Sequence, residues 1–372
     1  MKSKWIGLGL ALSLGLSGCD FMRALGYGYG ELSIQPGVFP LTELNTAYDD
    51  YNATAPPDPL QTSQRFLYAS NASSQGKHFD LHAGEMSLYW SYPSGYSRPD
   101  PPDVLSRGLG VFLPEANSEQ HEWGPSLLLL AAAPESLPAD VFMLWPSAEF
   151  RKPPGQAELQ KQFLSGPAIL SFTSDRQGQR DLFLWDSEAQ KVLPLGFNSA
   201  QAEDSYLSFD PARRTLYFSS DRGGSLDLYR LNVPNEVTDL KTWLQAPARA
   251  QEVEPVAELN SPQRESCPVF LGDLLVFASD RPGGQGGYDL YLSTFQNGKW
   301  QTPQNLQTRF PGGVPINTSS DEFRPALWSD PDLPRRPLML FSSNRIGGKG
   351  GFDLYTAVWP ELGMALLSPM KN

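Results

Sequence analysis

Short apolar and aromatic runs recur along the chain, and the clearest of them end in a serine and a polar, glycine-containing turn. A second short run follows each turn and opens with an aspartate. Two such runs around a Gly-rich turn are typical of a β-hairpin, and the units have no helical periodicity. The four clearest copies are 171–176 with 181–183, 217–222 with 227–229, 276–281 with 289–291, and 340–345 with 353–355.

Two weaker copies raise the number of units to six. One is Leu67–Asn71 with Phe79–Leu81, and the other is Leu128–Ala132 with Asp140–Phe142. The aspartates that open the second runs are 41 to 64 residues apart, which leaves room for four strands per unit. Repeats of this length predict a ring of small sheets. We therefore expect an all-β fold, a six-bladed β-propeller of four-stranded antiparallel blades.

A second repeated element precedes the units: an Asn followed by Ser or Thr, with an acid five residues after the Asn. These side chains bond to nearby backbone groups and set turns, so we interpret the element as the connector into each inner strand. Upstream of the first connector, Glu31–Ile34 alternates polar and apolar residues. We predict that this N-terminal strand completes the sixth blade and closes the ring, with Met364–Leu367 as the alternative. The connectors pair Asn45 with Asp50, Asn198 with Glu203, Asn260 with Glu265, and Asn317 with Glu322.

Composition agrees with a turn-rich, well-packed protein. Gly and Pro together make up 67 of 372 residues, above the usual ~12 per cent. Apolar residues at 40% and aromatic residues at 12% are enough for a substantial core, which excludes global disorder. The formal charge of −12 argues against nucleic acid as the main partner.

The N-terminus has the pattern of a secretory signal. Lys2 and Lys4 precede an apolar run over 5–16 that is shorter than a membrane span of roughly 20 residues. The run ends in Leu-Ser-Gly-Cys at 16–19, which resembles a bacterial lipobox and implies lipidation of Cys19. An ordinary signal peptide with a chance cysteine is the alternative.

The expected domains follow from this processing: a signal peptide over 1–18, a lipidated tether over 19–29 and the propeller over 30–372. Several acyl chains on one cysteine would hold the domain at a membrane surface. Cys267 would then have no partner for a disulfide. We expect a lipoprotein of the bacterial cell envelope, periplasmic or surface-facing, at a membrane that the sequence does not identify.

The repeat units resemble the TolB-type β-propeller repeat family. The glycine-rich copies at 283–289 and 347–353 are similar to the form found in envelope lipoproteins and peptidoglycan-associated proteins. Two units depart from the pattern, because Ala72 stands in place of the arginine and Ala133-Pro134 replaces the Asp-Arg pair. The resemblance implies a propeller whose partners are envelope proteins or peptidoglycan-associated proteins.

The repeated Asp/Asn-Arg pairs are predicted to be structural, because a turn is needed in every blade whereas a catalytic site is needed once. The acidic or amide side chain can accept turn amides, and the arginine can pair with the aspartate that opens the second run. The pairs are Asp175-Arg176, Asp221-Arg222, Asp280-Arg281 and Asn344-Arg345.

The connector acids Asp50, Glu203, Glu265 and Glu322 directly precede the expected inner strands. In a closed ring they would converge around one mouth of the central channel, where they could hold a divalent cation or a basic partner segment. Alternatively, each acid caps its own connector. We expect no other cofactor.

Catalytic motifs are nearly absent from the sequence. It contains no Gly-x-Ser-x-Gly, His-Glu-x-x-His, Cys-x-x-Cys or phosphate-binding loop. His78 and His82 would lie ~13 Å apart on one strand face, too far to share a metal, and His121 stands alone. The proline-rich stretch 92–114 reads as a projecting loop, either a contact surface or a cover for a sheet edge.

Together these patterns predict a lipid-anchored, monomeric, extracytoplasmic propeller that acts as a non-enzymatic interaction platform. One alternative is a carbohydrate-active enzyme, because oligogalacturonate lyases resemble the same repeat. Another is a propeller that holds a sugar or small ligand in its channel without chemistry.

Overall fold

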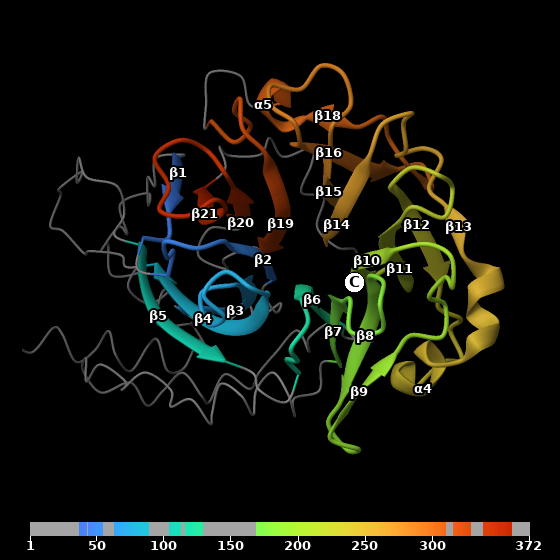
Figure 1. Cartoon of the computed structure of the whole chain (residues 1–372). Helices are drawn as coiled ribbons and strands as arrows, with labels where there is room; N and C mark the ends of the chain where they lie inside the picture. The colour runs from blue at the N-terminus through green and yellow to red at the C-terminus, as the bar shows by residue number, and fades with distance from the viewer. Residues whose placement is uncertain are drawn as a thin grey trace, which may run out of the picture. The chain divides into compact units, whose positions relative to one another are not determined.

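In the computed structural model, drawn in Figure 1, the strands of the described residues form five antiparallel sheets. The structure describes residues 37–42, 44–54, 63–88, 104–112, 116–128, 169–309, 315–328 and 338–358. All of them lie in one compact unit of the chain, 36–90 with 102–133 and 154–372. Among these residues no helix is long and apolar enough to cross a membrane.

Each sheet is a blade with its first strand innermost. Blade 1 is β2 (Asp50–Thr54), β3 (Ser63–Ser70), β4 (Asp80–Leu88) and β5 (Val104–Phe112). Blade 2 is β6 (Glu122–Leu128), β7 (Ile169–Ser174), β8 (Asp181–Asp186) and β9 (Lys191–Pro194). Blade 3 is β10 (Asp204–Asp210), β11 (Thr215–Ser220), β12 (Asp227–Asn232) and β13 (Glu254–Pro255).

The remaining two blades complete the set. Blade 4 is β14 (Glu265–Leu271), β15 (Leu274–Ser279) and β16 (Asp289–Gln296), with β17 (Lys299–Trp300) and β18 (Gln304–Asn305) both paired to β16. Blade 5 is β19 (Glu322–Trp328), β20 (Leu338–Ser343), β21 (Asp353–Val358) and β1 (Gly37–Pro40). The helical segments among the described residues are α4 (Leu240–Leu244), η2 (Pro247–Glu252) and α5 (Leu306–Arg309).

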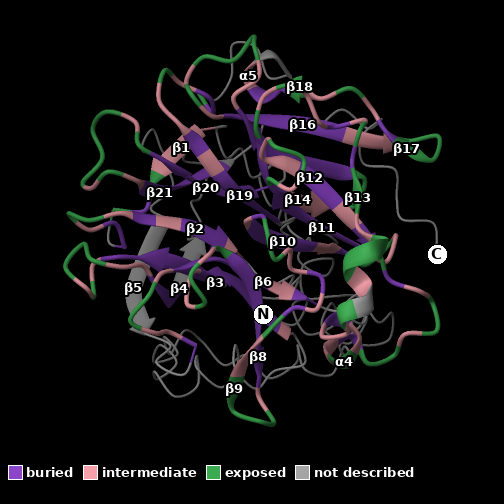
Figure 2. Ribbon diagram, turned by 45° about the vertical axis from the view of Figure 1, so that its right-hand side comes forward, coloured by how far each residue is buried: buried purple, intermediate pink, exposed green. Residues whose placement is uncertain are grey.

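The inner strands contact one another in the order β2, β6, β10, β14, β19 and back to β2. This cyclic order makes the described residues an all-β propeller of five blades around one axis (Figure 1). Apolar faces of successive blades pack together, and the buried residues follow the middle strands of every sheet (Figure 2). Phe341 and Tyr355 on adjacent strands of blade 5 stack with ring centroids 5.8 Å apart, as equivalent aromatic pairs do in blades 2, 3 and 4.

The prediction of six blades is not confirmed. Leu128, the first residue of the weak second unit, ends the inner strand β6 and pairs with Ile169 of β7. Leu128 therefore belongs to the blade of the third unit, and the rest of the weak unit lies outside the described residues. Because β2 and β6 contact each other directly, no further inner strand separates blades 1 and 2 at this point.

An N-terminal strand does complete the last sheet, but it is β1, Gly37–Pro40, which pairs antiparallel with β21. The predicted strand Glu31–Ile34, the alternative Met364–Leu367 and the lipidation site Cys19 lie outside the described residues. The stretch 92–114 is not a loop throughout, because Val104–Phe112 forms β5 and pairs with β4. Its serine, arginine and glycines masked the strand in the sequence, where β-branched residues are few.

Candidate functional site

The acid that opens each inner strand is buried at the centre of a hydrogen-bond network within its own blade. In blade 4, Glu265 is fully buried. Its carboxylate accepts hydrogen bonds from the Ser261 hydroxyl at 2.6 Å, the Ser279 hydroxyl at 2.8 Å and the Arg281 guanidinium at 2.9 Å. Arg281 also donates to the Leu259 carbonyl at 2.6 Å, so it ties the connector to the hairpin.

The other arginine-containing blades repeat this network. The expected pairing of each arginine with the aspartate of the second run was wrong for all four, because the structure pairs each with the acid of the inner strand. Asp289, for example, instead accepts the backbone N–H groups of Gln285 and Gly286 in the glycine-rich turn. The ion pairs are Arg176 with Glu122 at 2.8 Å, Arg222 with Asp204 at 2.7 Å, Arg281 with Glu265 at 2.9 Å and Arg345 with Glu322 at 3.1 Å.

The Asp or Asn beside each arginine holds the connector as well. In all four blades its side-chain oxygen accepts the backbone N–H of the residue just before the buried inner-strand acid. This contact fixes the entry into the inner strand from the hairpin turn. The bonds run from His121 to Asp175 at 2.9 Å, Glu203 to Asp221 at 2.8 Å, Arg264 to Asp280 at 2.7 Å and Asp321 to Asn344 at 2.8 Å.

Three of the four predicted mouth acids therefore lie inside the blades. Asp50, Glu265 and Glu322 are each 0% exposed, and their oxygens accept bonds from their own connectors and hairpins. Burial raises the pKa of Asp50 and of Glu322 above the ordinary value. Glu203 is different: its side chain is 47% exposed, and the buried acid of blade 3 is the next residue, Asp204.

Sequence reasoning missed the connector of blade 2. Asn117-Ser118 with Glu122 has the same spacing as the other copies. The Asn117 side chain accepts from the Leu81 N–H at 2.7 Å and donates to the Leu81 carbonyl at 3.1 Å. With this copy there are five connectors, one for each blade formed by the described residues.

Each inner strand carries a β-bulge at the second residue after its acid. All five bulge residues have a left-handed backbone, with φ between 45° and 61°, and the strand register shifts at each of them. A bulge re-aims side chains locally, and here it does so at the same height in every blade. The five residues are Asn52, Gly124, Tyr206, Cys267 and Arg324.

Three of these bulges are bonded to the preceding blade. The N–H of the bulge residue donates to the hydroxyl of a Ser or Thr that stands one residue before the last serine of the preceding blade's second strand. This hydroxyl therefore links neighbouring blades. The bonds are Asn52 to Ser342 at 3.0 Å, Tyr206 to Thr173 at 3.0 Å and Cys267 to Ser219 at 3.1 Å.

Gly124 is the bulge residue that must stay small. A Cβ atom there would lie 2.5 Å from the Tyr206 ring, and its φ of 50° also favours glycine. Trp123, Tyr206 and Cys267 form a buried cluster around the axis, with Tyr51 and Phe323 packed against it. Burial raises the pKa of the Cys267 thiol to about 12, so this cysteine is an inert part of the core at neutral pH.

A pocket of about 650 Å³ opens on the connector side of this cluster. Every blade contributes to it, through inner-strand residues and hairpin turns. Its walls combine aromatic rings with charges of both signs. The lining includes Tyr51, Tyr206, Tyr288, Phe323 and Phe352 together with Arg180, Arg264, Glu203, Asp221 and Asp321.

The two arginines of this axial pocket stack on aromatic rings and keep their charges partly in water. Arg180 lies 5.0 Å from the Trp123 ring centroid, and Arg264 lies 4.9 Å from that of Tyr288. Their side chains are 50% and 56% exposed. Arg180 also faces Glu203 at 3.5 Å. The axial pocket therefore offers rigid aromatic surface and accessible charge, the combination common in recognition sites.

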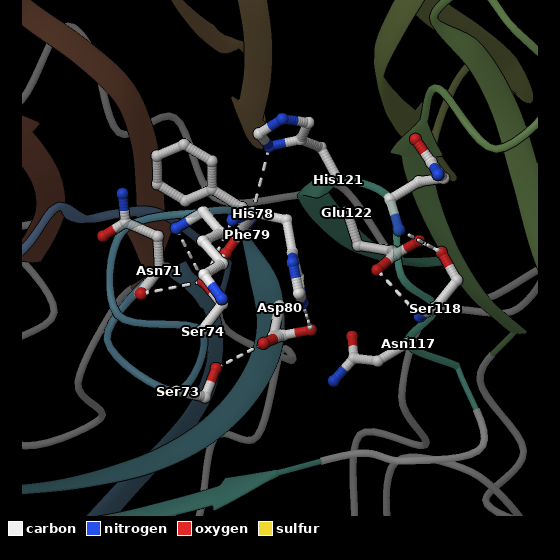
Figure 3. A network of polar contacts seen from close by, with 12 residues as sticks. Asn71, Ser73, Ser74, His78, Phe79, Asp80, Asn117, Ser118, His121 and Glu122 are labelled. Atoms are coloured by element: carbon white, nitrogen blue, oxygen red, sulfur yellow. Dashed lines mark hydrogen bonds and ion pairs between the residues drawn. The ribbon is translucent and has the colours of Figure 1, made fainter.

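Figure 3 shows the polar contacts that join the β3–β4 turn to the connector of blade 2. Ser73 donates to Asp80, and His78 Nε2 lies 3.6 Å from the same carboxylate. The aspartate thus stands between serine and histidine, whereas a serine nucleophile requires the histidine beside it. His121 stacks on Trp123 with ring centroids 4.7 Å apart and accepts the N–H of Phe79.

Within the described ranges, no three His, Cys, Asp or Glu side chains are grouped as metal ligands. His82 is buried and stacks on Tyr68 at 5.5 Å, and burial lowers its pKa. His82 therefore lies within blade 1, whereas His78 belongs to the β3–β4 turn and His121 to the connector of blade 2.

The fold is that of a β-propeller. No family model matches the chain, and no curated protein matches it. A solved putative TolB from Agrobacterium tumefaciens is 12% identical over 80% of this chain and 71% of its own, with a TM-score of 0.33. TolB from Acinetobacter baumannii is 12% identical over 84% and 64%, with a TM-score of 0.30. An α-L-arabinofuranosidase from Lactobacillus brevis is 9% identical over 87% and 94%, with a TM-score of 0.41. The structural similarity to TolB-like and other propellers is distant and concerns the fold alone.

Proposed function

We propose that this protein is a lipid-anchored, non-enzymatic binding protein of the bacterial envelope that engages a protein partner at its axial pocket. The observation that supports the proposal most strongly is the pocket itself, because it is the place where all five blades present residues that differ from blade to blade. The repeated acids and arginines form hydrogen bonds and ion pairs within the blades. The residues that line the axial pocket differ between blades and can therefore recognise a particular partner.

The chemistry of the pocket suits a polypeptide segment with both charged and aromatic side chains. Arg180 and Arg264 offer guanidinium groups, and Glu203 offers a carboxylate, all about half exposed. Tyr288 and Phe352 add apolar surface. Interfaces are enriched in aromatic residues and arginine, and opposite charges fix the register of the partner.

The test is site-specific photo-crosslinking in envelope preparations. A photoreactive residue in place of Glu203, which lines the pocket and is exposed, should give a discrete protein adduct. The same residue in place of Lys299, exposed at the outer edge of blade 4, is the control and should give none. No adduct at Glu203, or the same adduct at both positions, would count against the proposal.

A second candidate is supported by the size of the pocket. A volume of about 650 Å³ lies within the roughly 300–1,000 Å³ typical of small-ligand sites. A sugar could stack on the aromatic walls without undergoing chemistry. Neutral and acidic oligosaccharides that raise the Tm of the wild-type protein, but not of a Tyr288→Ala variant, would favour this function over a protein partner.

A further inference from the structure

Arg324 is a buried cation on the propeller axis, and no acidic side chain among the described residues pairs with it. It is the bulge residue of β19 and is 3% exposed. Its Nη2 donates to the Pro125 carbonyl at 2.8 Å and approaches the Gly124 carbonyl at 3.5 Å. Because β19 and β6 are not neighbours in the cyclic order of inner strands, the side chain reaches across the axis from blade 5 to blade 2.

The rest of this guanidinium is unsatisfied. Its Nε and Nη1 have no hydrogen-bond partner among the described residues. Those two atoms carry three of the five N–H donors of an arginine. The contrast with Arg281 is direct, because that arginine uses Nε on a serine hydroxyl and Nη2 on a carboxylate and a carbonyl.

The ionisable groups that act on Arg324 are Cys267 and Tyr206. Burial raises the pKa of Cys267 to about 12 and that of Tyr206 well above its ordinary value, so both are neutral at neutral pH. The Tyr206 ring lies 5.6 Å from the guanidinium carbon and offers only a weak cation–π contact. A buried charge without a counter-ion is costly, and an arginine does not become neutral by losing its proton.

We propose that Arg324 binds a small free anion, of the size of chloride or formate, on the axis beneath the pocket. We expect a small anion, because Tyr206 and Phe323 line the pocket whereas the buried Arg324 does not. The anion would neutralise the guanidinium and link blades 5 and 2 through it. The site is independent of what the axial pocket itself binds.

The first test measures the Tm of the full mature chain in a buffer whose only anion is bulky, at constant ionic strength, with added formate or chloride. An anion that binds only the folded state raises the Tm in a saturable way, by several degrees at about 100 times its Kd. We expect this rise for the wild-type protein and its loss in Arg324→Gln. Arg180→Gln, which removes a pocket arginine of equal charge, should keep it.

The second test needs no variant. Crystals of the wild-type protein soaked in bromide should show an anomalous peak within hydrogen-bond distance of Arg324 Nε or Nη1. Three outcomes would overturn the proposal: no anion dependence of the wild-type Tm, the same dependence in Arg324→Gln, or ordered water alone beside Arg324. A Tm rise that is lost in Arg180→Gln would also overturn it, because the anion would then belong to the pocket.

Discussion

Blades 4 and 1 both bury a carboxylate at the start of the inner strand, but they satisfy it differently. Glu265 of blade 4 has an arginine partner, Arg281, and two serine hydroxyls. Asp50 of blade 1 has the Ser70 hydroxyl and the Thr46 N–H, both at 2.5 Å, and Ala72 stands where blade 4 has its arginine. The repeated site can therefore be built with or without an ion pair, so the arginine is a structural addition to a hydrogen-bonded turn.

The largest effect is expected from removing the arginine of blade 4. Arg281→Met leaves Glu265 as a buried charge with only hydroxyl and amide partners, and breaking a buried pair costs about 3–5 kcal/mol. Urea denaturation should show this loss in the free energy of unfolding. Adding Glu265→Gln to the variant should restore part of it. A loss below about 1 kcal/mol, the range of exposed pairs, would mean that blade 4 does not depend on its ion pair.

The connector of blade 2 tests whether the Asn side chain stabilises the connector equally in different blades. Asn117→Ala removes two hydrogen bonds to Leu81, and we expect a loss of about 2 kcal/mol. Asn260→Ala is the matched variant in blade 4, where the same two bonds run to Leu228. Equal losses in thermal or urea unfolding would confirm the equivalence. The equivalence would be contradicted if Asn117→Ala left the free energy of unfolding unchanged while Asn260→Ala lowered it.

Blade 1 should tolerate loss of its charge. Asp50→Asn leaves no arginine unpaired, so we expect a change within about 1 kcal/mol at pH 7, against about 3 kcal/mol for Glu265→Gln. The pH dependence has a definite sign. Burial raises the pKa of Asp50 in the folded state, so the wild-type protein should gain stability relative to Asp50→Asn as the pH falls from neutral through the folded pKa. If the wild-type protein instead lost stability relative to Asp50→Asn as the pH falls, the folded state would depend on the charged form of Asp50.

The smallest effect is expected from giving blade 1 the missing arginine. The Ala72 N–H already bonds to the Ser70 hydroxyl at 3.1 Å, as the Arg281 N–H bonds to Ser279 at 3.2 Å. Ala72→Arg therefore starts from the right backbone and should raise the free energy of unfolding by up to about 1 kcal/mol. Calorimetry can detect this as a Tm rise of roughly one degree. A lower Tm would show that the Asp50 site cannot accept a guanidinium.

Much of the blade structure could be predicted from the sequence, because hairpins repeat and repetition makes a weak pattern visible. The runs around Phe218 and Phe277 became β11 and β15 as expected. The number of blades could not be read from the hairpins, because Leu128 of the worn unit pairs with Ile169 in blade 2 and the rest of that unit lies outside the described residues. The connectors agree in number with the blades of the described residues, and Asn117 was overlooked because no clear hairpin follows it directly in the sequence.

The axial residues could not be predicted, for a physical reason. Tyr51, Trp123, Tyr206 and Arg324 share neither residue type nor local motif, and only closure of the ring and the five bulges bring them together. Arginine partners were missed for a related reason. The spacing placed the second-run aspartate of the hairpin nearby in sequence, but the acid of the inner strand is closer in space.

The central claim is that the repeated residues hold the ring and the single-copy residues at the axis bind. It can be tested by measuring the yield of the Glu203 photo-adduct beside the Tm in two backgrounds, Arg264→Ala at the pocket and Asn260→Ala in the connector of blade 4. We expect Arg264→Ala to reduce the adduct yield several-fold with little change in Tm. We expect Asn260→Ala to lower the Tm but to keep the adduct yield at temperatures below that Tm. The reverse pattern, with binding lost in Asn260→Ala and kept in Arg264→Ala, would contradict the account.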